Sequence, residues 1–160
     1  MPSHDESKWF LFRRSGYQYT TFFDVYDVQA DSIIFRDWLI PTSGSMVLTP
    51  DGRYVFYSIP NTIFSGMAPS YFSVFDVEKN RITMLISTVG FIDGFNPVNM
   101  PVCDLAMTPD GRWLIAGDGG IGASIGEPTF LIFNIKNMTI EDYVDIPRVH
   151  GIYYTCQNSP

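Results

Sequence analysis

The sequence predicts an all-β fold built from repeated four-stranded antiparallel units, and three observations support this prediction. The string Thr-Pro-Asp-Gly-Arg begins at position 49 and again at position 108, 59 residues later. The strand pattern Phe-Ser-Val-Phe-Asp-Val at 72–77 recurs as Phe-Leu-Ile-Phe-Asn-Ile at 130–135, 58 residues later. No segment has a helical apolar period long enough to compete with these patterns. A repeat at nearly constant spacing is typical of architectures made from stacked units.

The two Pro-Asp-Gly copies each predict a hairpin turn between the first two strands of a unit. Proline sets φ for the first corner, the aspartate side chain can bond nearby backbone, and glycine accepts positive φ. An apolar run precedes each copy and an aromatic-aliphatic run follows it. The turns therefore fix where two strands of each unit begin and end.

Aligning the copies predicts three units within a single domain, 1–160. The first unit has strands at about 8–13, 19–28 and 32–40, and it lacks an innermost strand. The second has strands at 45–49, 53–58, 71–77 and 81–87, and the third at 102–108, 112–117, 129–135 and 139–146. A lone innermost strand at about 149–155 follows the third unit. Such repeated antiparallel units are the blades of a β-propeller.

Composition and charge exclude some classes of partner. With 46% apolar and 16% aromatic residues, the chain has the composition of a globular protein rich in strand formers. The net charge of −7 argues against binding nucleic acid through its phosphates. No apolar run has the ~18–20 residues of a membrane span, and the N-terminus has no signal-peptide pattern, so we expect a soluble protein of undefined compartment. Cys103 and Cys156 are expected to be free thiols.

The repeats resemble the WD-like and YVTN-type propeller repeats. The motif is carried by 49–53, by 108–112 and by Asp27, Asp76 and Asn134, near the ends of the strands expected at 19–28, 71–77 and 129–135. The first copy departs from the motif with His-Asp-Glu-Ser at 4–7. The resemblance covers nearly the whole chain and implies the propeller fold. Similar repeats occur in lactonases, TolB-like proteins, amine dehydrogenase heavy chains and scaffolds, so the resemblance implies no single activity.

The number of units predicts a partner. Closed propellers have about 4–8 blades, and three alone would leave sheet edges and apolar faces exposed. We expect a homodimer of six blades, in which the final strand of each chain pairs with the strand near Trp9 of the other. The alternative is that the chain is a piece of a longer propeller.

The long loops are the expected location of a ligand site. In propellers, loops such as 60–70, 88–101 and 117–128 gather on one face around the channel. Aromatic and polar side chains there could bind a small molecule or a protein segment. The ligand-binding candidates are Tyr17, Tyr19, Phe64, Phe91, Phe95, Asp118, Glu127 and His150. The alternative for the aromatic residues is that they bury against a partner subunit. The glycine-rich segment 117–127 could bind phosphate through its backbone N–H groups, but it lacks the Gly-Lys-Ser/Thr of a P-loop, and the alternative is a flexible loop.

Two sets of residues could hold a metal ion. His150 and Asp104, with Cys103, would mix nitrogen, oxygen and sulfur ligands that suit zinc at the channel mouth. An oxygen-rich set is similar in kind to the calcium ligands of lactonase-type propellers, and it contains Asp93, Asn96 and Asn99. The structural alternative is that these residues cap strands and form turns.

These features predict a module that binds a ligand or partner through its loop face. The first alternative is a lactonase-like, metal-assisted hydrolase, and the second is a piece of a larger propeller oxidoreductase subunit. Whether the protein is an enzyme stays open. Nucleophilic catalysis has no support, because there is no Gly-x-Ser-x-Gly and only His4 and His150 could act as an imidazole base.

Overall fold

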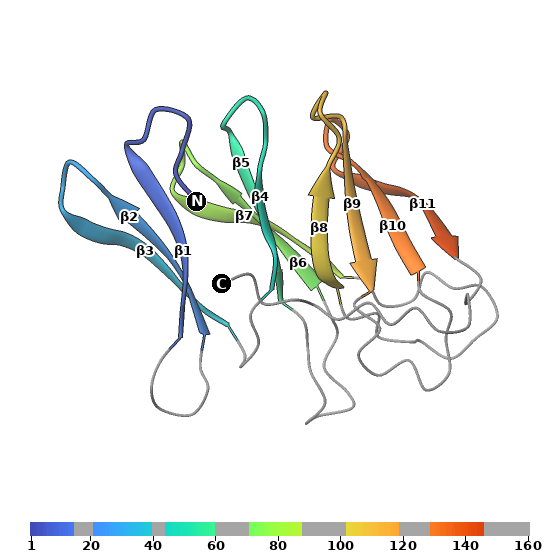
Figure 1. Cartoon of the computed structure of the whole chain (residues 1–160), viewed down its shortest axis with the longest axis horizontal. Helices are drawn as coiled ribbons and strands as arrows, with labels where there is room; N and C mark the ends of the chain where they lie inside the picture. The colour runs from blue at the N-terminus through green and yellow to red at the C-terminus, as the bar shows by residue number, and fades with distance from the viewer. Residues whose placement is uncertain (15–20, 40–43, 60–70, 88–101, 119–128, 146–160) are drawn as a thin grey trace.

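The computed structural model describes residues 1–14, 21–39, 44–59, 71–87, 102–118 and 129–145, which form three antiparallel sheets arranged as a fan (Figure 1). Blade 1 contains β1 (Lys8–Arg14), β2 (Thr21–Asp27) and β3 (Ser32–Leu39). Blade 2 contains β4 (Met46–Leu48), β5 (Tyr54–Ile59), β6 (Tyr71–Asp76) and β7 (Arg81–Ser87). Blade 3 contains β8 (Val102–Met107), β9 (Trp113–Asp118), β10 (Thr129–Asn134) and β11 (Thr139–Asp145).

The prediction of an all-β fold is confirmed, and each sheet pairs its strands in sequence order. All eleven strands of these sheets overlap strands expected from the repeats. The expected strand at 149–155 lies outside the described residues, as does Cys156. No helix in the described ranges has the length and apolar character that crossing a bilayer requires.

The turn between the first two strands of blades 2 and 3 is held by one hydrogen-bond pattern. The Thr49 hydroxyl donates to Asp51 Oδ1 at 2.5 Å and accepts from the Tyr54 backbone N–H at 2.9 Å. Asp51 Oδ1 also accepts from the Arg53 N–H at 3.0 Å, and Gly52 has φ of 72°. The blade 3 turn at 108–113 repeats each of these contacts, at 2.6, 3.1 and 3.1 Å. The recurring motif is thus explained by backbone groups that the side chains satisfy.

The first copy builds the same turn from a different sequence. The Ser3 hydroxyl donates to Asp5 Oδ1 at 2.7 Å and accepts from the Lys8 N–H at 3.0 Å. The Ser7 N–H donates to the same carboxylate oxygen at 3.1 Å. Glu6 occupies the glycine position with φ of 56°. Serine and aspartate therefore preserve the turn, and glutamate accepts the left-handed backbone.

This turn gives a first prediction: Glu6→Gly should raise the free energy of unfolding by about 1 kcal/mol. A non-glycine residue in the left-handed region costs ~1–2 kcal/mol, partly offset by the greater freedom of glycine in the unfolded chain. Urea denaturation measures the change, and Glu6→Ala is the matched control because alanine does not relieve the backbone. An equal gain for both variants would contradict the explanation.

The innermost position of blade 1 requires a correction to the sequence prediction, because residues 1 and 2 occupy its end. The Phe10 N–H donates to the Met1 carbonyl at 2.8 Å, and the Met1 amino group donates to the Phe10 carbonyl at 2.9 Å. Pro2 forms an antiparallel bridge with Trp9. Two residues are too short to show a strand pattern in the sequence. The edge of β1 at Trp9 and Phe10 is therefore already paired within the chain.

The acidic or amide residue that ends β2, β6 and β10, the last strand but one of each blade, caps the next turn. Asp27, Asp76 and Asn134 each accept a hydrogen bond from the backbone N–H three residues later, at 2.8, 2.9 and 3.1 Å. The fourth residue after each has positive φ. This local role accounts for the recurrence of these side chains.

The core lies between the blades rather than within any one of them. Between blades 1 and 2, the fully buried members are Phe10, Phe23, Val25, Val55, Tyr57 and Phe75. Between blades 2 and 3, the buried members are Phe56, Phe72, Val74, Ile86, Leu105, Leu114, Ala116, Leu131 and Phe133. Each blade is thus stabilised by the face of its neighbour, as expected for a sheet that buries alternate side chains on each side.

Candidate functional site

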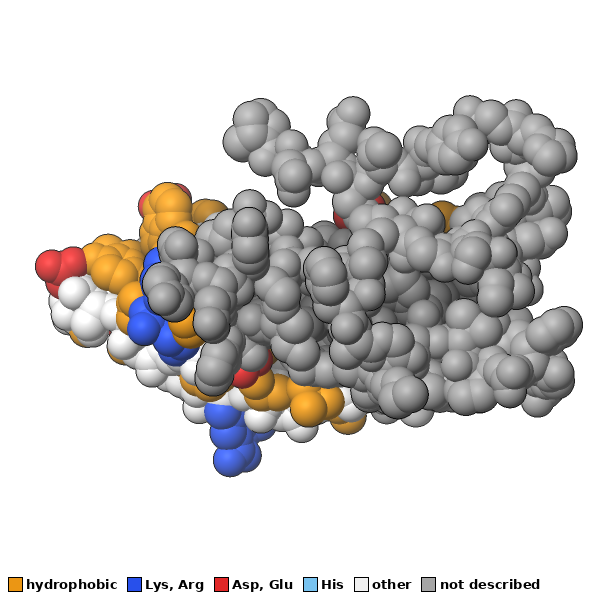
Figure 2. Space-filling model, turned by 90° about the horizontal axis from the view of Figure 1, so that it is seen from below, with side chains coloured by type: hydrophobic (Ala, Val, Ile, Leu, Met, Phe, Trp, Pro, Cys, Tyr) orange, Lys and Arg blue, Asp and Glu red, His pale blue; other side chains and the backbone are white. Residues whose placement is uncertain are grey.

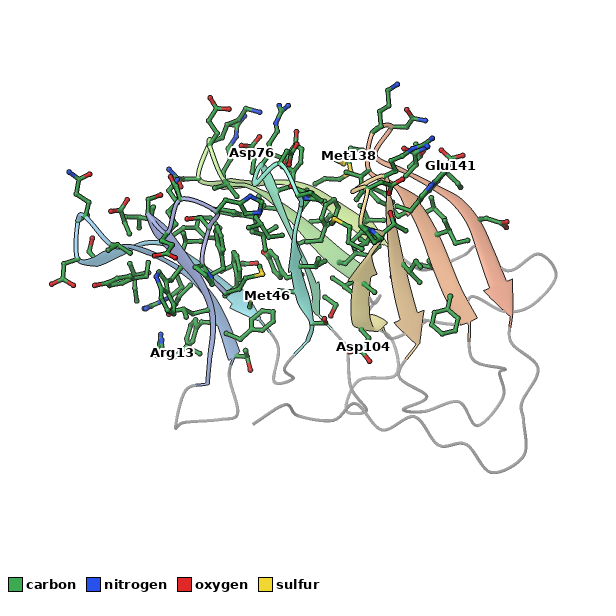
Figure 3. All side chains as sticks on the ribbon, turned by 45° about the horizontal axis from the view of Figure 1, so that its top comes forward. Arg13, Met46, Asp76, Asp104, Met138 and Glu141 are labelled. Carbon is green, nitrogen blue, oxygen red and sulfur yellow. The ribbon has the colours of Figure 1, made fainter. Side chains whose placement is uncertain are left out.

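A groove of about 440 Å³ lies between blades 2 and 3, at the end of the molecule where the tight turns lie. Its walls are the 49–54 turn of blade 2 and two turns of blade 3. Figure 3 shows Met138, one lining residue, at this end and Asp104 at the opposite end. The lining residues are Thr49, Pro50, Asp51, Arg53, Tyr54, Asp110, Gly111, Arg112, Ile135, Lys136 and Met138.

The two walls are held together by direct packing of one turn on the other. A Cβ atom added to Gly111 would lie 2.8 Å from Pro50 Cδ and 2.9 Å from Pro50 Cγ. Gly111 also has φ of 67°, a backbone conformation that suits glycine. The proline of blade 2 therefore lies against the glycine of blade 3, and this contact sets the spacing of the groove walls.

The corresponding space between blades 1 and 2 is bridged by a side chain. Lys8 Nζ donates to the Val77 carbonyl at 2.8 Å and to Asn80 Oδ1 at 3.0 Å, and so connects the two blades. Tyr54 and Met138 occupy the positions of Lys8 and Asn80 one repeat later. Met138 has no amide oxygen, so the two hydrogen bonds that Lys8 donates have no complete counterpart between blades 2 and 3.

The floor of the groove is apolar. Tyr54, Ile135 and Met138 are partly buried and pack against the core between blades 2 and 3. They replace the polar bridge of the preceding blade pair with aromatic and aliphatic surface. An apolar side chain of a ligand can contact this floor.

The rim of the groove carries three exposed cationic side chains: Arg53, Arg112 and Lys136. The Arg53 guanidinium carbon lies 5.0 Å from the centroid of the Tyr54 ring, within the range of a cation–π interaction. None of the ion pairs formed by the described residues involves these three cations. At longer range the charge of Arg53 helps to lower the pKa of Asp51 and Asp76, and the charge of Arg112 helps to lower the pKa of Asp110.

Two carboxylates in the rim are already engaged by the turns. The Thr49 hydroxyl, followed by the Arg53 backbone N–H, lowers the pKa of Asp51, and the equivalent groups of the blade 3 turn lower the pKa of Asp110. Both stay ionised at neutral pH, with one oxygen each held by the turn. With three cations and two carboxylates, the groove has a local positive balance on a chain of net charge −7.

Three of the residues that the sequence singled out for a site lie within described strands: Cys103 and Asp104 in β8, and Asp118 at the end of β9. Asp104 is exposed at the end of blade 3 opposite the groove, and the register places Val102 beside Asp118 and Asp104 beside Gly117. The structure thus brings the backbones of Asp104 and Asp118 close together on neighbouring strands. The other candidates lie outside the described residues: Tyr17, Tyr19, Phe64, Phe91, Asp93, Phe95, Asn96, Asn99, Glu127 and His150. Within the described ranges, no three His, Cys, Asp or Glu side chains are placed to share a metal ion.

Sequence reasoning missed the groove because it treated the Pro-Asp-Gly turns only as connections. The available signal was a comparison of equivalent positions in successive units. Lys8 is replaced by Tyr54, and Asn80 by Met138, while Arg53 and Arg112 recur in both full motif copies. Together these changes indicate an apolar and cationic surface between blades 2 and 3.

Solved structures resemble this chain in fold, although no protein-family profile and no curated protein sequence matches it. Hydrazine synthase of Kuenenia stuttgartiensis is similar with a TM-score of 0.59 and 14% identity, over 84% of this chain and 39% of that one. The dihydro-heme d1 dehydrogenase NirN is similar with a TM-score of 0.59 and 14% identity, over 94% of this chain and 27% of that one. The β-propeller domain of the trilobed protease from Pyrococcus furiosus is similar with a TM-score of 0.52 and 16% identity, over 89% of this chain and 40% of that one.

The chain spans between about a quarter and two fifths of the length of those structures. At such low identity the likeness concerns the fold and not the activity. The three successive antiparallel sheets, with the core packed between them, agree with this likeness in fold. The chain is therefore a β-propeller module.

Proposed function

We propose that this module binds an acidic peptide segment in the groove between blades 2 and 3. The observation that carries the proposal is the placement of three exposed cations around an apolar floor, none of them in a close ion pair with another described residue. A groove of 440 Å³ falls within the ~300–1,000 Å³ of typical ligand sites.

The chemistry of the rim favours carboxylates. Arg53 and Arg112 present planar guanidinium groups that can bind a carboxylate through two parallel hydrogen bonds, and Lys136 adds a point charge. The ring of Tyr54 orients Arg53 before a ligand arrives, which lowers the entropy lost on binding.

The apolar floor sets a second requirement for the ligand. An apolar ligand side chain between two acidic ones would lie on Tyr54, Ile135 and Met138. A peptide that alternates acidic and aliphatic residues meets both requirements. Repulsion from the net charge of the chain is screened beyond ~8 Å at physiological salt, so the local cations determine the ligand.

Fluorescence anisotropy with a labelled hexapeptide that alternates glutamate and leucine tests the proposal. We expect saturable binding that weakens with added salt. The double variant Arg112→Ala/Lys136→Ala should bind about tenfold more weakly, because two exposed ion pairs contribute ~0.2–1 kcal/mol each. Arg81→Ala is the matched control, since Arg81 is an exposed cation outside the groove, and it should bind as the wild type does.

Three results would overturn the proposal. They are no saturable binding of the glutamate peptide, equal binding of the counterpart with lysine in place of glutamate, and unchanged binding by the double variant. Binding of free glutarate as tightly as of the peptide would also contradict a peptide ligand, because the floor would then contribute nothing.

Ligand binding at the loop face, a zinc or calcium site and a metal-assisted hydrolase stay predictions. Metal analysis of the purified protein is the direct measurement for the last two. Stoichiometric calcium or zinc would favour a catalytic role at the channel mouth. Metal uptake unchanged in Asp104→Asn would remove Asp104 from the candidate ligands.

A further inference from the structure

Blade 1 exposes a face that both other blades bury. Five apolar positions, which we call the accepting face, are exposed or partly exposed in blade 1: Trp9, Leu11, Tyr26, Val28 and Ile33. Their exposed fractions include 45% for Trp9 and 47% for Val28. Figure 2 shows hydrophobic side chains beside Lys and Arg side chains at the blade 1 end of the molecule.

The repeat identifies what this face normally contacts. In blade 2 the same five positions all pack against blade 1, and they are Val55, Tyr57, Phe75, Val77 and Ile82. In blade 3 they all pack in the core shared with blade 2, and they are Leu114, Ala116, Phe133, Ile135 and Ile140. The accepting face of blade 1 therefore has the pattern of a contact between two blades, and an adjacent blade is the surface that fits it.

We propose that a second copy of this chain supplies that blade, with blade 3 of each copy packed on blade 1 of the other. The face of blade 3 that points away from blade 2, which we call the offering face, has apolar residues at the same repeat positions as the faces that blades 1 and 2 pack against the next blade. Its members are Ala106, Trp113, Ile115, Phe130 and Ile132, which stand where blade 2 has Val47, Tyr54, Phe56, Phe72 and Val74. A two-fold pair covers both faces at once in a ring of six blades, within the known range.

Individual contacts within the chain indicate how the two faces meet. Phe23 stacks on Tyr57 with a centroid separation of 4.2 Å, and Phe130 and Leu11 are the equivalent pair between two copies. Lys8 donates to the Val77 carbonyl, and the equivalent donor and acceptor are the indole N–H of Trp113 and the carbonyl of Val28. Polar and apolar contacts can therefore both continue across the new interface.

Charge on the accepting face agrees with this partner. Asp24, only 1% exposed, is held by Arg13 at 2.8 Å and by Arg36 at 2.7 Å. Burial alone would raise the pKa of Asp24, but the hydrogen bonds and charges of Arg36 and Arg13 together lower it. The group carries a net positive charge, because two cations surround one carboxylate. The outer strand of blade 3 carries the exposed carboxylates Glu141 and Asp142, and its register pairs Asp142 with Ile132 of the offering face.

Light scattering after size exclusion of the full chain tests the pairing. We expect twice the 18.1 kDa mass of one chain for the wild type. Leu11→Glu changes the accepting face and Ala106→Glu the offering face, both at exposed positions, and each variant alone should be monomeric. Leu85→Glu, at a position 61% exposed on β7, is the matched control and should dimerise as the wild type does.

Mixing the two variants gives the sharpest result. A pair made of one Leu11→Glu chain and one Ala106→Glu chain has one doubly altered interface and one intact interface. The mixture should therefore recover a dimer, with circular dichroism confirming that both variants are folded. A monomeric wild type, dimeric single variants, a mixture that stays monomeric, or a concentration-dependent series of longer oligomers would each overturn the proposal.

Discussion

Phe75→Ala is expected to lower the free energy of unfolding by about 3–5 kcal/mol, the range for removing a buried phenylalanine side chain. Phe75 is fully buried and contacts three rings of blade 1: Phe10 at 6.2 Å, Phe23 at 5.5 Å and Phe35 at 4.8 Å between centroids. The rings cannot close the cavity, because Phe23 is also stacked on Tyr57. Loss of this much stability should separate blade 1 from blade 2.

Urea denaturation followed by circular dichroism measures this effect. The matched control is Leu85→Ala, since Leu85 is 61% exposed and should change stability by less than about 0.5 kcal/mol. Phe75→Leu keeps most of the buried volume and should fall between the two. If Phe75→Ala and Leu85→Ala had equal effects, the core between blades 1 and 2 could not be the main contact that holds blade 1.

The strands could be predicted from the sequence because their pattern is repeated and locally encoded. The Thr-Pro-Asp-Gly-Arg motif fixes the turn through its own side chains, as the contacts of Thr49 and Asp51 confirm. Once one unit is recognised, the others follow from spacing. The capping residues at the ends of β2, β6 and β10 are predictable for the same reason.

Other features lack a repeated pattern or depend on contacts between units, and were not visible in the sequence. The pairing of Met1 with Phe10 involves too few residues to form a pattern. The turn with Glu6 at positive φ departs from the motif while keeping its hydrogen bonds. The groove lies where Tyr54 and Met138 replace Lys8 and Asn80, which bridge the preceding blade pair, and only the spatial neighbours show which positions to compare.

The packing of one turn on the next gives the second large effect: Gly111→Ala should lower the free energy of unfolding by about 2–5 kcal/mol. The left-handed backbone contributes ~1–2 kcal/mol of this cost. The contact of the new Cβ with Pro50, at 2.8 Å from Cδ, adds the ~1–3 kcal/mol typical of overpacking.

Gly52→Ala is the matched control, because Gly52 has φ of 72° but its added Cβ would meet only His4, at 3.6 Å. It should therefore lose only the backbone part, about 1–2 kcal/mol. Equal losses for the two variants would show that Pro50 moves freely and does not set the spacing of the groove walls. The same pair of variants also bears on binding, since displacing the 108–113 turn moves Arg112 relative to Arg53. The glutamate peptide should then bind Gly111→Ala more weakly than Gly52→Ala, even at a temperature where both variants are fully folded.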